Sequence, residues 1–154
     1  MSKLEMFAKA SGYGLAFHGP VLIQLWQEGT PDQGAMKAVE AAEALSRQQH
    51  TKVGSLIIVT EHASLPSPRA RSILADLPSR LGRASGVALV REGEGFRSAA
   101  VRAVMTGIMM FSREPVPHQI FASSDDAIAW LCGLVDASPG PLAESLATLR
   151  AEFT

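Results

Sequence analysis

Residues 53–60, with the sequence VGSLIIVT, form the short apolar run that decides the fold class. Its β-branched residues favour a strand, and its length is that of a strand and not of a helix. Helical patterns of apolar residues lie on both sides of it, which is typical of a strand buried within a parallel sheet. We therefore predict that this run is a central strand of an α/β protein.

The segments around this strand continue the alternation of strands and helices. Residues 12–17 and 21–27 flank the turn sequence His18-Gly19-Pro20 and predict a β-hairpin. Residues 86–90 and 118–122 are two further strand candidates, each preceded by a helical pattern. This order predicts a single-domain α/β fold with a mostly parallel five-stranded sheet, an N-terminal β-hairpin and flanking helices.

Capping residues mark the expected helix starts. Thr30 and Ser67 each precede a proline, and Ser124 precedes two aspartates, so these three residues are the predicted N-caps. Pro78 lies inside the second helical pattern, where we expect a kink or a break.

Length and composition limit the classes of protein. The 154 residues are enough for one domain with its own core. We expect the α/β domain at residues 12–135, after a lead-in at 1–11 and before a linker and amphipathic helix at 136–154. The formal net charge of −1 argues against a strongly basic nucleic-acid binder. The single cysteine, Cys132, excludes an internal disulfide and a cysteine-based zinc site.

The sequence also gives expectations for location and cofactors. No stretch reaches the roughly 18–20 uninterrupted apolar residues that a membrane-spanning helix needs. Lys3, Glu5 and Lys9 interrupt the N-terminal segment, which lacks the apolar centre of a signal peptide. We therefore expect a cytoplasmic protein without a membrane span. The four histidines show no metal-ligand spacing, so neither a metal nor another cofactor is expected.

Few residues suggest catalysis. Glu61 and His62 follow the central strand at its carboxyl end, where α/β proteins commonly bind ligands, but adjacent residues of a strand point to opposite sides. Residues 93–95, Gly-Glu-Gly, lack the third glycine of a dinucleotide loop and the Lys-Ser/Thr of a P-loop, so we predict a tight turn with positive φ. Cys132 lies in an apolar helical run, and its thiol is expected to be buried and inert.

The loop and helix start after the central strand are the preferred binding region. Loops at the carboxyl ends of α/β strands sit on a rigid support. Pro66 and Pro68 stiffen this loop, so less conformational entropy is lost when a partner docks. Ser64 is a candidate for phosphorylation, since a phosphate there would lie near a helix N-terminus and two arginines. The residues predicted to contact a protein partner are Glu61, His62, Ser64, Ser67, Arg69 and Arg71.

Residues 96–111 form a helical pattern that is apolar on nearly all sides. Such a helix is buried on two sides or contributes to an interface. Its Met105, Ile108, Met109 and Met110 are predicted to contact a second copy of the chain or an apolar ligand. We expect a homodimer, because this helix and the terminal one carry more apolar surface than one sheet face needs.

Several short motifs match one known family. They are LWQEG at 25–29, SLIIVT at 55–60, the loop–helix sequence EGEGFRSAAVRAVMTG at 92–107, and FASSDDAIAWL at 121–131. With the helix after Thr30-Pro31, they resemble STAS-like proteins of the SpoIIAA-like group over most of the chain. The resemblance implies a small α/β domain that binds other proteins and catalyses no reaction.

In the anti-sigma-factor antagonists of this family, a partner kinase phosphorylates a serine at the start of the helix after the central strand. Ser64 and Ser67 lie in the corresponding region, while the aspartate and glycine of the family's motif are absent here. The resemblance therefore implies, as the leading expectation, a non-enzymatic regulatory module for protein–protein interaction. A domain that binds a small apolar ligand or lipid is the alternative, and a small enzyme using Glu61 and His62 is the weaker one.

Overall fold

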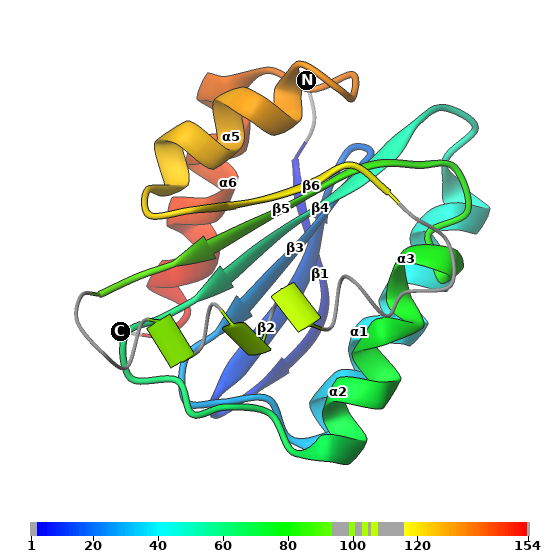
Figure 1. The fold of residues 1–154 in the computed structure, drawn as a ribbon. Coiled ribbons are helices and arrows are strands. Elements are labelled where there is room, and N and C mark those ends of the chain that lie inside the picture. The colour runs from blue at the N-terminus through cyan, green and yellow to red at the C-terminus, as the bar shows by residue number, and fades with distance from the viewer. Residues whose placement is uncertain (1–2, 94–98, 101–102, 105, 108–115, 154) are drawn as a thin grey trace.

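The computed structural model describes residues 3–93, 99–100, 103–104, 106–107 and 116–153. Among these residues, six strands form one mixed sheet with helices on both faces, which confirms the predicted α/β class (Figure 1). The strands are β1 (Leu4–Ala10), β2 (Tyr13–His18), β3 (Val21–Trp26), β4 (Val53–Val59), β5 (Ala84–Arg91) and β6 (His118–Phe121). The helices are α1 (Asp32–Gln48), α2 (Pro68–Ala75), α3 (Leu77–Arg80), α5 (Ser124–Cys132) and α6 (Pro139–Ala151).

The strands lie in the sheet in the order in which they occur in the sequence. The pairings of β1 with β2 and of β2 with β3 are antiparallel, whereas those from β3 to β6 are parallel. The predicted hairpin is confirmed as β2 and β3. The run that begins at Val53 is β4, in the interior of the sheet as predicted.

The sheet has one strand more than the predicted five, because the expected lead-in contains β1. A register shift between Met6 and Ala8 interrupts the pairing of β1 with β2. This shift breaks the two-residue alternation by which a strand is predicted from sequence. Glu5 and Lys9 are exposed on β1, as is common on the edge of a sheet, and their charges further obscure the pattern.

Helices α1, α2 and α3 cover one face of the sheet, and α5 and α6 cover the other (Figure 1). The connections from β3 to β4 and from β4 to β5 proceed in the same direction across the sheet. Because such crossovers are right-handed, their helices lie on the same face, which explains why α1, α2 and α3 form one layer. Val104, between β5 and β6, packs in that layer too. Residues 99–100, 103–104 and 106–107 are helical, and the rest of the predicted helix at 96–111 lies outside the described residues.

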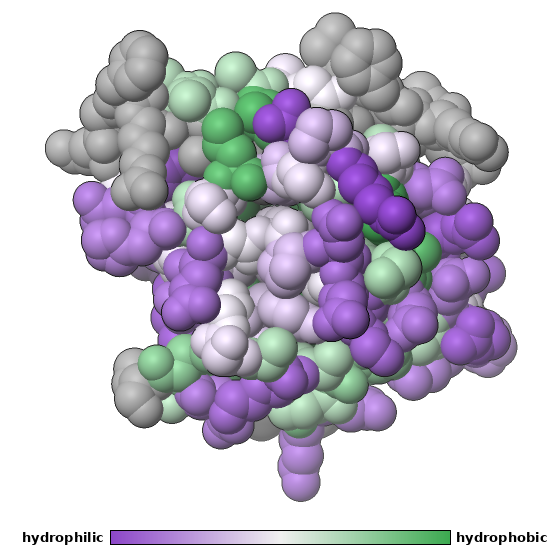
Figure 2. All heavy atoms as spheres, turned by 90° about the horizontal axis from the view of Figure 1, so that it is seen from below, coloured by the Kyte–Doolittle hydropathy of each residue, from purple (hydrophilic) through white to green (hydrophobic). Residues whose placement is uncertain are grey.

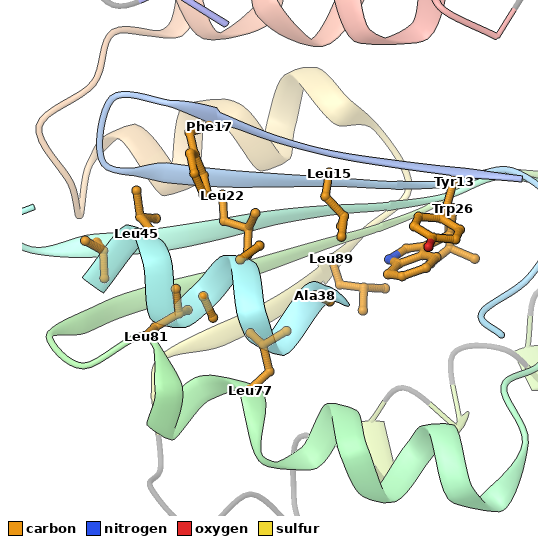
Figure 3. Close-up of a cluster of buried hydrophobic side chains, with 14 of the residues drawn as sticks. Tyr13, Leu15, Phe17, Leu22, Trp26, Ala38, Leu45, Leu77, Leu81 and Leu89 are labelled. Carbon is orange, nitrogen blue, oxygen red and sulfur yellow. The ribbon is translucent and has the colours of Figure 1, made fainter. Parts of the chain in front are cut away.

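Figure 3 shows the hydrophobic core beneath α1, to which Trp26 belongs. A buried polar network lies beside Trp26. The indole N–H of Trp26 donates to Gln24 Oε1 at 3.2 Å, and Gln24 Nε2 donates to Ser55 Oγ at 3.0 Å. Ser55 Oγ in turn donates to the Leu22 carbonyl at 3.0 Å. The Tyr13 ring packs against the indole, with 5.2 Å between ring centroids. The network thus joins β3 to β4 and gives each of its polar side chains a partner.

In the opposite core, two glycines bring α5 close to the sheet. Gly54 of β4 and Gly86 of β5 are neighbours across the parallel pairing. A Cβ atom on Gly54 would lie 2.9 Å from Leu131 Cδ1 and 3.0 Å from the Gly86 carbonyl oxygen. A Cβ atom on Gly86 would lie 2.7 Å from Leu134 Cδ1. Leucine side chains of α5 and the turn after it therefore occupy the space that larger strand residues would fill.

The structure confirms one of the three predicted N-caps. Ser67 is the N-cap of α2, and its hydroxyl accepts the Ala70 amide at 3.0 Å. Thr30 does not cap α1, because the chain is still extended at Pro31 and the helix begins one residue later. The N-cap of α5 is Ser123 and not Ser124, for the Ser123 hydroxyl accepts the Asp126 amide.

The break predicted near Pro78 is confirmed by the separation of α2 and α3.

His18 of β2 connects the sheet to α6 through a buried contact. Its Nδ1 lies 2.6 Å from Ser145 Oγ, and both residues are buried. Burial lowers the pKa of His18 below its usual value of about 6.5.

We expect the free energy of unfolding to decrease as the pH falls below about 6.5. Because the pKa of His18 is lower in the folded state, the unfolded chain takes up the proton first. The stability present above this pH is therefore lost as the pH falls towards the folded-state pKa. Urea unfolding between about pH 7.5 and 5.5 measures the effect. The decrease of the unfolding free energy with falling pH should be smaller in His18→Gln. It should persist in His50→Gln, the control at an exposed position. An equal pH dependence in wild type and His18→Gln would contradict the prediction.

Candidate functional site

Three loops meet at the carboxyl ends of β3 and β4: the β1–β2 turn, the β3–α1 loop (residues 27–31) and the β4–α2 loop (residues 60–67). The last two run side by side along the bottom of Figure 1. The Gly12 carbonyl accepts the amides of Gln27 and Glu28 at 2.9 and 3.3 Å. Thr60 Oγ1 donates to the Gln27 carbonyl at 2.8 Å. The β3–α1 loop is therefore held by hydrogen bonds from both neighbouring loops.

Ser64 ties the β4–α2 loop to the β3–α1 loop. Its amide and its hydroxyl both donate to the Glu28 carbonyl, at 3.0 and 3.2 Å. Gly29 lies directly against it with a φ of 151°, and a Cβ atom there would collide with Ser64 Oγ. Ser64, the candidate for phosphorylation, is thus exposed and also takes part in the contact between the two loops.

The start of α2 is fixed to the start of α1 through Asp32. Ser67 Oγ donates to Asp32 Oδ1 at 2.7 Å, and Arg69 Nε lies 3.8 Å from Asp32 Oδ2. Arg71 is half-buried, and its Nε donates to the Pro66 carbonyl at 3.1 Å. Arg69 and Arg71 were expected to lie near a phosphate on Ser64. In the unmodified chain, they contact Asp32 and the Pro66 carbonyl instead.

Glu61 and His62 lie at the opposite end of the same loop. Both side chains are exposed, and neither lines the hollow described below. Glu61 packs over Gly93, whose φ of 90° fits the tight turn predicted at residues 93–95. All six predicted partner-binding residues thus lie on the β4–α2 loop and the start of α2.

An open hollow of about 550 Å³ lies between the three loops. Figure 2 views this end of the molecule from below, where hydrophilic side chains surround a central area of intermediate hydropathy. The hollow is lined by two carboxylates, Glu28 and Asp32, and by Gln33. Leu65 also lines the hollow. The lining residues that carry a hydroxyl are Ser11, Tyr13, Thr30, Ser64 and Ser67.

Other predicted sites are only partly covered by the structure. Met105, Ile108, Met109 and Met110, the predicted dimer or apolar-ligand surface, lie outside the described residues. Cys132 is half-buried and not fully buried as expected, and this partial burial raises the pKa of its thiol. Among the described residues, no three metal-ligating side chains gather. Within the same residues, no helix has the length and apolarity to cross a bilayer.

Comparison with models of protein families, with curated proteins and with solved structures finds no match. The resemblance to STAS-like proteins therefore stays a prediction.

The sequence analysis placed the binding region on the β4–α2 loop. It did not include the β3–α1 loop or the β1–β2 turn. Glu28 and Thr30 follow β3 at its carboxyl end, next to the carboxyl end of β4. Parallel neighbouring strands bring such loops together, and this rule was the available signal. Ser11 and Gly12 join the site only through β1, which was not predicted.

Proposed function

We propose that this protein is a non-enzymatic, regulatory module that binds another protein through the β4–α2 loop and the start of α2. The docking surface consists of Glu61, His62, Ser64, Leu65, Ser67, Arg69 and Arg71. The observation that carries the proposal is Leu65, which is 41% exposed in a loop held in place by hydrogen bonds. An exposed apolar side chain on a preorganised loop, surrounded by polar groups, resembles the anchor of a protein interface.

Regulation by phosphorylation is consistent with the contacts of Ser64. Its hydroxyl is the donor in the bond to the Glu28 carbonyl. A phosphate ester has acceptor oxygens and negative charge in place of this donor, so the bond would be lost. Modification would then loosen the β4–α2 loop from the β3–α1 loop and change the docking surface.

The test uses a photo-reactive amino acid at position 65 and, as a matched control, at position 36. Met36 is 43% exposed on α1, so the two positions are equally accessible. We expect a partner to be cross-linked from position 65 and not from position 36. With the purified partner, Leu65→Ala should weaken binding by about tenfold or more, because an interface anchor is lost.

Met36→Ala should leave the affinity for that partner unchanged. Both variants should keep the free energy of unfolding within about 0.5 kcal/mol of wild type, since both side chains are largely exposed. Equal cross-linking from both positions, or an unchanged affinity in Leu65→Ala, would refute the proposed docking surface.

A further inference from the structure

We propose that β1 pairs with β1 of a second copy of this chain, so that two sheets join across a two-fold axis. β1 is the last strand at its end of the sheet, and within the described part of the chain no strand pairs with its outer side. The outer N–H and C=O groups of such an edge strand can pair with another strand. This interface is separate from docking through Leu65. It also differs from the expected dimer surface on the helix at 96–111.

The N-terminal part of β1 has an apolar side and a charged side. Leu4 packs in the core that α5 and α6 cover, and Met6 follows two residues later on the same side of the strand. Met6 is 40% exposed, so the helices leave part of this side uncovered. Lys3 and Glu5 alternate with these two residues and therefore point to the opposite side, where both are exposed.

The charges of Lys3 and Glu5 favour one register for this pairing. When two antiparallel strands are related by a two-fold axis, the residue at the axis lies opposite its own copy. With Leu4 at the axis, Lys3 of each copy lies opposite Glu5 of the other, at a Cβ separation of about 4.5–5.5 Å, and both pairs attract. With Lys3 or Glu5 at the axis, like charges would face each other, which is destabilising.

The two charges needed for this register are available, whereas the other lysine of β1 is not. Lys3 and Glu5 form no ion pair with the described residues. Lys9 Nζ lies 3.3 Å from Glu152 Oε1 and 5.7 Å from the centre of the Phe153 ring. The register shift after Met6 separates Lys9 from the first part of the strand. The open part of the edge is therefore the segment that the charges of Lys3 and Glu5 align.

The test is sedimentation equilibrium of the full chain at low ionic strength and at protein concentrations up to about 1 mM. A strand pair this short forms a small interface, so we expect a reversible dimer with a Kd on the order of 0.1 mM. The average mass should rise with concentration from that of the 16.3 kDa monomer towards twice this value. A mass of 16.3 kDa at all of these concentrations would overturn the proposal.

Exchange of the two charges tests the register. Glu5→Lys and Lys3→Glu each place like charges opposite one another in both pairs, so each should raise the Kd of the dimer at least about tenfold. An equimolar mixture of these two variants should associate as wild type does, because every pair across the two strands then joins opposite charges. The same holds for the double variant Lys3→Glu/Glu5→Lys.

Glu40→Lys is the matched control, because it makes the same change of charge at an exposed position of α1. It should leave the Kd of the dimer unchanged. A dimer whose Kd is the same in wild type, Glu5→Lys and Lys3→Glu would have its interface elsewhere, which would overturn the proposal. So would a mixture of these two variants that associates no better than either one alone.

Discussion

Replacing Gly54 with valine should lower the melting temperature by about 6–12 °C. The added Cβ would lie 2.9 Å from Leu131 Cδ1 and 3.0 Å from the Gly86 carbonyl oxygen, and a backbone atom of a central strand cannot move aside as a side-chain end can. Overpacking of this kind costs about 3 kcal/mol, which corresponds to the stated shift for a chain of this size. Thermal unfolding followed by circular dichroism measures it.

Gly140→Ala is the matched control for this substitution. Gly140 lies in the first turn of α6, and a Cβ atom there would meet nothing within 4 Å apart from its chain neighbours and the backbone of the helix itself. Alanine has the higher helix propensity but also a Cβ atom next to the Pro141 ring, and the two effects oppose each other, so this variant should stay within about 1 kcal/mol of wild type. A melting temperature of Gly54→Val within a degree or two of wild type would show that α5 does not pack on the sheet as described.

Replacing Gln24 with leucine should reduce the free energy of unfolding by about 2 kcal/mol. Leucine is similar in volume, so the main effect is on hydrogen bonding. The indole N–H of Trp26 would lose its acceptor, and Ser55 Oγ would lose the donor on its side facing β3. A buried donor without a partner costs about 1–3 kcal/mol, because water is absent to replace the bond. Urea unfolding provides the measurement.

The double variant Gln24→Leu/Ser55→Ala tests whether these side chains act as a network. Residues that share hydrogen bonds are not additive, so the double variant should lose at least about 0.5 kcal/mol less than the sum of the single ones. Gln119→Leu, at an exposed position of β6, is the control and should change stability by less than about 0.5 kcal/mol. Strict additivity, or an equal loss in Gln119→Leu, would contradict the network.

Periodicity and turn residues were sufficient to predict the elements that the core depends on. The apolar run of β4, the turn at Gly19 and the cap at Ser67 each have a local physical cause, so they are visible in a single sequence. β1 was missed because a register shift and exposed charges conceal its alternation. Local rules therefore recovered the interior of the sheet better than its edge.

The candidate site was predicted in part for a related reason. Its position at the carboxyl end of β4 follows from the α/β topology, which the sequence indicates. The bonds from the Ser64 amide to the Glu28 carbonyl and from the Glu28 amide to the Gly12 carbonyl join residues far apart in the chain through backbone atoms. Backbone atoms are the same in every residue, so such contacts leave no pattern in the sequence.

The contact between His18 and Ser145 affects how the chain can fold during synthesis. These residues are 127 positions apart, so β2 is synthesised long before α6, which covers one of its faces. Until the ribosome has released α6, apolar side chains of β2 and β3 on this face have no cover within the chain. The nascent domain therefore exposes an unfinished core for most of its synthesis, which is the condition under which chaperones bind a polypeptide.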